Sequence, residues 1–394
     1  MEGLSLSTNS KRILITGTRA PCALEIARHF HFAGHEIMSA ESLKHPLCKY
    51  SRCIKHTFRV PPPRQDPQGY VGALIHLIKD NRIDLLIPTC EEIYTISKYA
   101  DRLKASCEVF CDNFNTLLKL HDKWQFIKWA RKLELQVPRT WKLESIADYY
   151  NLFQQGLPFD IILKPIFSRF ASNIHHVYKD HPQLPKIEIS KEFPWIAQQW
   201  LEGDAYCTYS VVKEGRMQAH AIYPVKICAG QGACIYFESS QQAQITAWVK
   251  SFVEKIKFTG QIAFDFMQDA RGIFYPIECN PRATSGVHLF DKDQGLDRAF
   301  LQTCQAPLIP KTSTKKMVSL AMCFYGWSTL RTFKGMQTWG RSFFKAHDVL
   351  FDLHDLGPFL SQFVTFYNIW QMAKHNNQSL LAAATHDIEF NGEL

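Results

Sequence analysis

Short apolar runs alternate with amphipathic segments along the first part of the chain. β-branched residues fill residues 12–16, apolar residues follow at helical spacing over 22–34, and a second apolar run occupies 36–40. The alternation continues with a helix, a buried strand, a helix and a short strand at 70–82, 83–89, 90–104 and 107–112. Strands that alternate with helices predict a parallel sheet covered by helices on both faces. We therefore expect a Rossmann-like domain over residues 1–115.

The pattern changes after residue 115. Residues 116–135 look helical, and the chain then passes through short strand-like runs separated by Gly, Pro and Asp. A helical pattern at 241–258 precedes two strands, 260–268 and 272–280, that are joined by a short polar turn. Strands joined by short turns predict an antiparallel sheet and an α+β domain, which we place at residues 116–300. The expected fold class is therefore α/β plus α+β.

Charge separates the last part of the chain from the rest. Residues 301–347 contain seven Lys or Arg and no acid, whereas residues 348–394 contain six acids and the single base Lys374. We treat 301–394 as a mostly helical C-terminal extension, with a helix that starts near Pro358 and whose apolar face is expected in the core. Three roles for the basic, aromatic part stay open. They are completion of the core, which we favour, contact with an anionic membrane surface, and binding of an acidic acceptor.

The composition is that of an ordinary globular protein. Apolar residues make up 46% of the 394 residues and charged residues 21%, and the net charge of +8 does not by itself indicate nucleic acid. The 12 cysteines are scattered and form no Cys-x-x-Cys pair, which favours reduced thiols over a zinc site or a disulfide framework. The N-terminal residues lack the apolar region of a signal peptide, and no apolar run has the length of a membrane span. We therefore expect a cytoplasmic protein.

The first turn of the Rossmann-like domain departs from the dinucleotide-binding pattern. Gly17 is in place, but Arg19 and Cys22 stand where the later glycines of G-x-G-x-x-G would lie. We therefore favour a scaffold without a bound dinucleotide. An NAD-linked oxidoreductase is the weaker alternative.

Oxygen ligands gather in the hairpin formed by the strands at 260–268 and 272–280. Glu278 and Asn280 share one face of their strand, because successive side chains alternate between faces. If the turn centres on residues 269–272, Asp265 lies almost opposite Glu278. Two carboxylates and one amide oxygen suit Mg²⁺, which binds carboxylates together with nucleotide phosphates.

The residues that surround these ligands decide between a cleft and a surface turn. Pro281 ends the strand because it lacks the N–H of the ladder, and Arg282 can then present its planar fork to a phosphoryl oxygen. A solvated turn explains the spacing about as well on its own. Apolar neighbours favour a strand that is packed on its other face, so that the polar face lines a cleft; they are Phe264, Phe266, Ile277 and Cys279.

A phosphate site also needs cations from other parts of the chain. Lys164 ends an apolar strand just before a proline, and Lys123 lies in the helix expected after residue 115. Each lysine taken alone is more typical of a solvated surface. The segment Ile196–Gly203 leads out of a strand, so its backbone can bind a flat heterocycle while Trp200 and Leu201 form an apolar wall. For Trp200 the alternative is an ordinary core position.

In this order the motifs resemble the ATP-grasp superfamily over residues 12–290. The likeness is greatest to its carbamoyl-phosphate synthase-like branch of carboxylate–amine ligases. A Rossmann-like domain precedes a helix-to-strand segment with "HDKW", then the motifs "LKPI", "IAQQWLEGD", "AFDF" and "IECNPR". The last of these is the most specific. The resemblance implies a Rossmann-like pre-ATP-grasp domain followed by an ATP-grasp domain of two subdomains.

The resemblance also implies a role for each candidate residue. Lys123 and Lys164 would contact the phosphates of ATP, and Arg282 would be the catalytic residue that steadies the γ-phosphoryl group. The adenine would lie against the hinge residues Gln198, Gln199 and Leu201. The ligands of Mg²⁺, with Mn²⁺ as an alternative ion, would be Asp265, Glu278 and Asn280.

The implied reaction joins two small molecules. A substrate carboxylate attacks ATP to give an acyl-phosphate and ADP, and an amine, or less often a thiol, then displaces phosphate. A homodimer through the first domain is compatible with this expectation.

One segment departs from the family pattern. Many relatives carry a glycine-rich loop over the phosphates, whereas residues 166–174 contain no glycine, and the polar side chains there are Ser168, Arg169 and Ser172. The alternative function is therefore a catalytically degenerate nucleotide-binding scaffold that acts as a partner-binding module.

Overall fold

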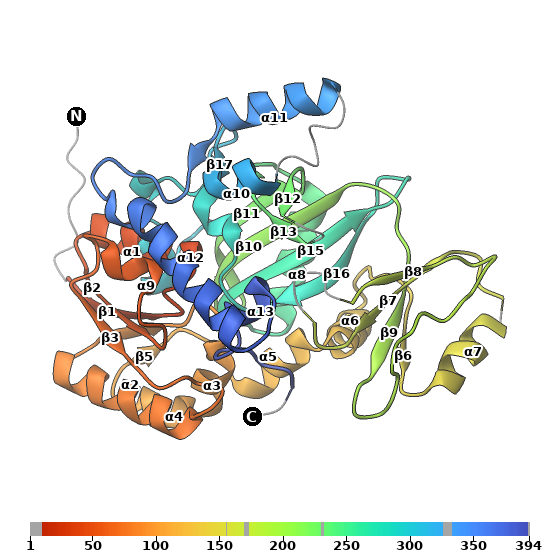
Figure 1. The fold of residues 1–394 in the computed structure, drawn as a ribbon, viewed down its shortest axis with the longest axis horizontal. Helices are drawn as coiled ribbons and strands as arrows, with labels where there is room; N and C mark the ends of the chain where they lie inside the picture. Colours follow the sequence, from red (N-terminus) through yellow and green to blue (C-terminus); the bar gives the residue numbers. More distant parts are fainter. Residues whose placement is uncertain (1–9, 155, 169–172, 230–231, 326–332, 393–394) are drawn as a thin grey trace.

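The computed structural model describes residues 10–154, 156–168, 173–229, 232–325 and 333–392 (Figure 1). A five-stranded parallel sheet forms the first part of the molecule, and two four-stranded antiparallel sheets follow along the chain. The expected α/β plus α+β class is therefore confirmed.

The parallel sheet has the strand order β3-β2-β1-β4-β5. Its central strand β1 (Arg12–Thr16) is buried on both faces, because Leu14 joins one hydrophobic cluster while Ile13 and Ile15 join another. The edge strand β3 was not expected, since its four residues are polar or only half-buried. The elements that follow β1 are α1 (Pro21–Phe32), β2 (Glu36–Glu41), η1 (Leu47–Tyr50), β3 (His56–Arg59), α2 (Pro67–Asn81), β4 (Leu85–Ile87), α3 (Glu92–Lys98), α4 (Ala100–Lys104) and β5 (Glu108–Val109).

The helical structure expected at 116–135 is confirmed, but it is divided into two helices. The chain forms α5 (Phe114–His121) and α6 (Lys123–Lys132), and Asp122 between them has an extended backbone. The Asp122 carboxylate accepts a hydrogen bond from the Gln125 N–H at 2.8 Å, so it caps the second helix. The break makes Lys123 the first residue of α6.

The smaller antiparallel sheet has the order β6-β9-β7-β8. One face packs against α7 through a hydrophobic cluster that includes Leu163 and Tyr149. Because side chains alternate along a strand, Lys164 points to the opposite face. The elements of this subdomain are β6 (Thr140–Leu143), α7 (Ile146–Gln154), β7 (Ile161–Pro165), β8 (His175–Val177) and β9 (Trp195–Gln199).

The larger antiparallel sheet has the order β11-β10-β15-β16. On one face Phe264 and Phe266 pack against Trp248 and Phe252 of α8, so Asp265 lies on the other face. Its main elements are β10 (Ala205–Lys213), β11 (Arg216–Pro224), α8 (Ala243–Lys255), β15 (Gly260–Gln268) and β16 (Phe274–Asn280). Shorter elements around this sheet are β12 (Cys228–Ala229), β13 (Ala233–Cys234), β14 (Tyr236–Glu238), η2 (Ser285–Leu289), η3 (Lys292–Gln294) and α9 (Leu296–Leu301).

The C-terminal part first adds to the middle of the molecule and then returns to the first domain. Strand β17 pairs with β14 on one side and β18 on the other. Two ion pairs then fasten the chain to the Rossmann-like domain, Arg28 with Asp355 and Arg19 with Asp387. The elements are β17 (Lys315–Met317), α10 (Ser319–Tyr325), α11 (Phe333–Lys345), β18 (His347–Asp348), α12 (Gly357–His375) and α13 (Leu380–Ala383).

Helix α12 starts where the sequence predicted, but the expectation that its apolar face lies in the core is wrong. Pro358, Ser361 and Thr365 are buried, whereas Leu360 and Phe363 are 65% and 57% exposed. Within the described residues no helix combines the length and the apolar character needed to cross a bilayer.

Candidate functional site

The hairpin of β15 and β16 brings the expected oxygen ligands together. Asp265 pairs directly with Glu278 in the strand register, and Asn280 pairs with Ala263 two residues along β15. The turn is closed by Asp269, which accepts from Gly272 and donates to Ile273 through its backbone. The geometry expected from the sequence is therefore confirmed. The metal-binding role of these residues stays a prediction.

A β-bulge next to Asp265 and Glu278 exposes a backbone carbonyl that Lys164 contacts. The register between β15 and β16 shifts after Asp265, so Ile277 is the extra residue of β16. Its carbonyl accepts a hydrogen bond from Nζ of Lys164 on β7, at 3.0 Å. The bulge thus connects the smaller sheet to the hairpin of the larger one.

Both candidate lysines are buried, contrary to the surface position that each alone would suggest. Lys123 and Lys164 expose only 2% and 4% of their surface. Nζ of Lys123 donates to the Ser168 carbonyl at 3.0 Å and lies 3.6 Å from Oε1 of Glu278. The site therefore places cations from α6 and β7 against carboxylates from β15 and β16.

Burial disfavours the charged forms of two of these groups. It raises the pKa of Asp265 to about 6, with the nearby Glu278 carboxylate adding to the effect. Burial also lowers the pKa of Lys164 to about 8, with Lys123 adding to the effect and Glu278 opposing it. The cluster therefore holds lysine and carboxylate groups that are poorly solvated and whose opposite charges partly neutralise each other.

The donor set fits Mg²⁺ with phosphate rather than a metal held by protein alone. Two carboxylates and the amide of Asn280 are hard oxygen ligands, and Mg²⁺ typically takes one or two carboxylates together with substrate phosphates. Across the described ranges, no group of three or more His, Cys, Asp or Glu side chains is suited to hold a metal ion.

Arg282 follows the strand and faces the first domain. Its guanidinium donates to the Ala283 carbonyl at 3.2 Å and to Oδ1 of Asn280 at 3.4 Å. Its Nε lies 3.9 Å from Oε1 of Glu91. Burial opposes the charged form, but Glu91 and other nearby acidic groups more than offset it and raise the Arg282 pKa.

The sequence did not single out Glu91, which is 4% exposed. It contacts Arg282 and also accepts the Phe390 N–H at 3.1 Å, so it joins the first domain, the hairpin and the C-terminal segment. A usable signal was its place just after β4, since ligand sites lie at the carboxyl ends of parallel strands. The hydrogen bond from Phe390 to Glu91 joins residues far apart in the sequence, so no local sequence pattern predicted it.

The hinge residues lie in different surroundings. Gln198 is buried and donates to Oγ1 of Thr140 at 3.1 Å, and Leu201 is also buried. Trp200 is 39% exposed and stacks on His176 at 4.5 Å, so it is not the core residue that was the simpler expectation. Within the described part of the chain, the Leu201 N–H makes no hydrogen bond.

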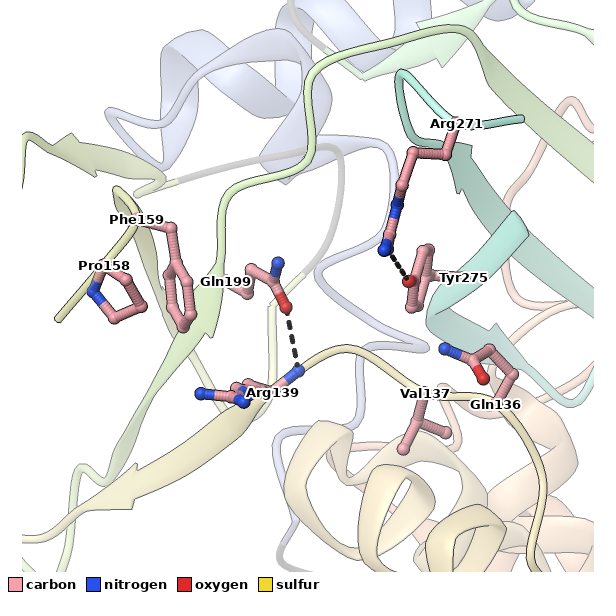
Figure 2. A pocket seen from close by; sticks show the side chains of 8 residues that line it. All are labelled: Gln136, Val137, Arg139, Pro158, Phe159, Gln199, Arg271 and Tyr275. Carbon is pink, nitrogen blue, oxygen red and sulfur yellow. Dashed lines mark hydrogen bonds between the residues drawn. The ribbon is translucent and has the colours of Figure 1, made fainter. Parts of the chain in front are cut away.

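Gln199 lines a separate cavity of about 330 Å³ (Figure 2). Figure 2 shows the Arg139 N–H hydrogen-bonded to Oε1 of Gln199. On another side of the cavity, Arg271 is hydrogen-bonded to the Tyr275 hydroxyl. The cavity is lined by Gln136, Val137, Arg139, Pro158, Phe159, Gln199, Arg271 and Tyr275. It includes neither the acidic hairpin residues nor the two buried lysines, so we place the chemistry at the cluster around Glu278.

Only part of the glycine-free segment is described. Ser168 uses its carbonyl to accept from Lys123, and its hydroxyl donates to the Pro165 carbonyl at 3.5 Å. Arg169 and Ser172, which were candidates for phosphate contacts, lie outside the described residues.

The fold and the cluster around Glu278 together describe the kind of protein this is. A Rossmann-like domain precedes two antiparallel sheets. The hairpin of one sheet meets Lys123 of α6 through Glu278 and Lys164 of the other sheet through the Ile277 carbonyl. Residues 120–286 match the family model described as an ATP-grasp domain. These residues, fewer than half of the chain, are therefore similar to an ATP-grasp domain.

Solved structures with low sequence identity share this fold. The L-amino acid ligase from Bacillus licheniformis has a TM-score of 0.55 at 14% identity, covering 75% of this chain and 75% of that chain. The N5-carboxyaminoimidazole synthetase from Staphylococcus aureus, complexed with ADP, has a TM-score of 0.58 at 13% identity, covering 77% and 80%.

A third structure is the biotin carboxylase domain of the Hydrogenobacter thermophilus 2-oxoglutarate carboxylase, in complex with MgADP, ADP and bicarbonate. Its TM-score is 0.56 at 10% identity, and the alignment covers 76% of this chain and 71% of that chain. The search of curated proteins found no match to this chain.

Proposed function

We propose that the protein is an ATP- and Mg²⁺-dependent ligase that activates a carboxylate as an acyl-phosphate and joins it to an amine, or to a thiol. The products would be the ligated molecule, ADP and phosphate. The observation that carries the proposal is at the junction of the two sheets, where Lys123 meets Glu278 and Lys164 meets the neighbouring Ile277 carbonyl. The ligase and carboxylase names of the solved structures, with their bound ADP and MgADP, support it.

The electrostatics of the cluster suit a nucleotide with its metal ion. Burial raises the pKa of Asp265 and lowers that of Lys164, so both groups lose part of their charge near neutral pH. Phosphate oxygens would favour protonated Lys164, and a divalent cation would favour ionised Asp265. Bound Mg²⁺ would supply charge neutralisation on the phosphate oxygens.

The remaining residues would orient the nucleotide. The N–H of buried Leu201, which makes no hydrogen bond within the described residues, would donate to a ring nitrogen of adenine, and Gln198 would lie beside the same ring. Lys123, held by the Ser168 carbonyl, would reach the phosphates from the start of α6. Gln199 would contribute through its backbone, because its side chain is turned to the other cavity.

Arg282 would act on the reacting groups. A carboxylate oxygen of the substrate attacks the γ-phosphorus of ATP, and the bond to the β-phosphate oxygen breaks to release ADP. The amine nitrogen then attacks the acyl carbon, phosphate leaves, and the amine proton passes to the released phosphate or to water. Fixed by Asn280 and Glu91, the Arg282 guanidinium would stabilise the charge on the transferred phosphoryl group.

The scaffold alternative stays tied to one observation, the lack of glycine in residues 166–174. A loop with side chains at every position brings its backbone less closely to phosphate than a glycine-rich loop does. A protein of this kind would bind ATP without turnover.

Calorimetry with a non-hydrolysable ATP analogue and Mg²⁺ tests the nucleotide site. We expect micromolar binding by the wild type and loss of that binding in Asn280→Ala, which removes one ligand and a contact of Arg282. Asn151→Ala, at an exposed position of α7, is the matched control and should bind like the wild type. Absence of binding in the wild type would contradict the proposal.

Turnover separates the ligase from the scaffold. Pools of carboxylates and amines are screened for release of ADP, and Glu278→Gln should abolish that release while it preserves the fold. The control is Glu254→Gln, which changes an exposed carboxylate of α8. Nucleotide binding without ADP release from any pool would favour the scaffold.

A further inference from the structure

Helix α12 packs against the protein with its small and polar side, and most of its large apolar side chains are exposed. Its small or polar residues face the protein, and Oγ1 of Thr365 donates to the His45 carbonyl at 3.1 Å. Most of its large side chains face outward, with Leu360, Phe363 and Tyr367 at 65%, 57% and 54% exposure, although Phe359 packs against the core. A helix that covers its own core normally shows the reverse arrangement. Among the described residues nothing covers the outward side of α12, so it is open to contact with another molecule.

The exposed residues form a regular stripe. Leu356, Leu360, Phe363, Tyr367 and Trp370 follow each other at intervals of four and three residues, which is the heptad spacing of paired helices. Between Leu356 and Trp370 the stripe is about 21 Å long, from the rise of an α-helix. No charged residue occurs from Gly357 to Ala373.

The helix is held firmly in this orientation. Before it, Arg28 binds the carboxylate of Asp355 and the carbonyls of Val349 and Leu350 in a buried cluster. After it, Arg19 binds Asp387. Figure 1 shows α12 along the outside of the first domain, and its contacts include η1 and α13. These anchors keep the apolar side outward.

The area of the stripe is compatible with a protein interface. Its five residues and the neighbouring Phe366 are between 41% and 65% exposed. With roughly 200 Å² for each side chain of this size, they offer about 600 Å² on one copy. Two such faces bury about 1,200 Å² before any polar rim is counted, which reaches the range of stable protein interfaces. This area is at the upper end of the largest apolar patch on a typical monomer, and such patches are often functional.

Charge argues against an anionic lipid surface as the occupant. Helices that lie on such membranes carry lysines and arginines around the apolar face. Residues 348–394, which contain α12, have six acids and only Lys374 as a base. An uncharged, regularly spaced stripe is compatible with an identical stripe, because no like charges meet when two copies pair about a two-fold axis.

We propose that the outward face of α12 is the interface of a homodimer, in which the α12 helices of two copies pair in antiparallel fashion with Phe363 near the two-fold axis. Trp370 and Tyr367 of one copy then pack near Leu356 and Leu360 of the other. The nucleotide cluster contributes nothing to this interface, so the dimer forms with or without ATP.

Sedimentation equilibrium of the full chain tests the proposal. The wild type should be a dimer at micromolar concentration, and Phe363→Asp should raise the dimer dissociation constant roughly thirtyfold or more, the effect of losing a central hot spot. Phe344→Asp is the matched control, because Phe344 on α11 is 85% exposed and lies outside the stripe, and it should remain a dimer. Circular dichroism and thermal melting of each variant show that it is folded.

A second variant covers the case in which an aspartate disturbs the helix itself. Leu360→Gln combined with Phe363→Gln removes apolar area without adding charge and should also give a monomer. A wild type that is monomeric at these concentrations would overturn the proposal, and so would a Phe363→Asp protein that still forms the dimer. Binding of a monomeric wild type to phosphatidylcholine vesicles would assign the face to lipid instead.

Discussion

Glu25 of α1 should make the stability of this protein depend on pH in the acid range. The Glu25 carboxylate is buried and accepts a hydrogen bond from Nδ1 of His288 in η2 at 2.9 Å, and His29 lies 3.8 Å away. Burial opposes the charged form, but His288 and His29 more than offset it and lower the Glu25 pKa from 4.5 to about 2. The contact joins the first domain to the segment that follows Arg282.

The size of the effect follows from the difference between the folded and unfolded pKa values. The difference is 4.5 − 2 = 2.5. At 1.36 kcal/mol per unit it corresponds to about 3 kcal/mol of stability. A depressed carboxyl pKa stabilises the fold above the unfolded value, so this contribution is fully present at neutral pH. It falls as pH drops from about 4.5 towards about 2.

Urea unfolding of Glu25→Gln beside the wild type measures this contribution. Glutamine keeps the shape and one acceptor oxygen, so the variant should be less stable by about 3 kcal/mol at pH 7, and the difference should shrink below pH 4.5. Glu254→Gln, at an exposed position of α8, should change stability by less than about 0.5 kcal/mol. Equal stability of Glu25→Gln and the wild type at pH 7, or a difference that is constant down to pH 3, would refute the reasoning.

Three other variants test the anchoring of the C-terminal part and the nucleotide site. Arg28→Ala leaves the buried carboxylate of Asp355 without the guanidinium that neutralises its charge, so urea unfolding should show a loss of about 3 to 5 kcal/mol; a loss under about 1 kcal/mol would mean that water replaces the guanidinium. Phe390→Ala removes a ring stacked on Tyr94 at 4.4 Å and should cost about 3 to 5 kcal/mol in the same assay, whereas an unchanged midpoint would show that this segment is not fixed. Under the proposed function, Lys164→Met would remove a charge-assisted contact to phosphate and should weaken binding of the ATP analogue by roughly 10- to 100-fold in calorimetry, and unchanged affinity would remove this lysine from the site.

The sequence was a sufficient guide where one local rule decides the structure. Alternation of side chains and the position of the turn were enough to pair Asp265 with Glu278, and the register confirms it. The same rules did not locate the bulge at Ile277, because it depends on how the two strands twist together. The Lys164 contact depends on that bulge, so the burial of the lysine was missed as well.

Local rules also missed contacts between distant segments. The helical pattern at 116–135 did not reveal the break at Asp122, although aspartate is a preferred N-cap residue. The contact of Glu91 with Arg282 and with Phe390 joins three separate parts of the chain. Spacing within any one of those segments carries no information about such a contact.

Helix α12 shows a further limit of periodicity. An apolar stripe on a helix indicates that this side of the helix is buried, and the usual inference is that the same chain covers it. Here the opposite side of the helix already satisfies the chain, because Thr365 bonds to His45 and the small side chains of Pro358 and Ser361 allow a close approach to η1. When the residues opposite an apolar stripe can also pack, the helix has two sides suited to burial. The core of its own chain can cover only one of them. That combination indicates an interface between molecules, and it can be looked for before a structure is known.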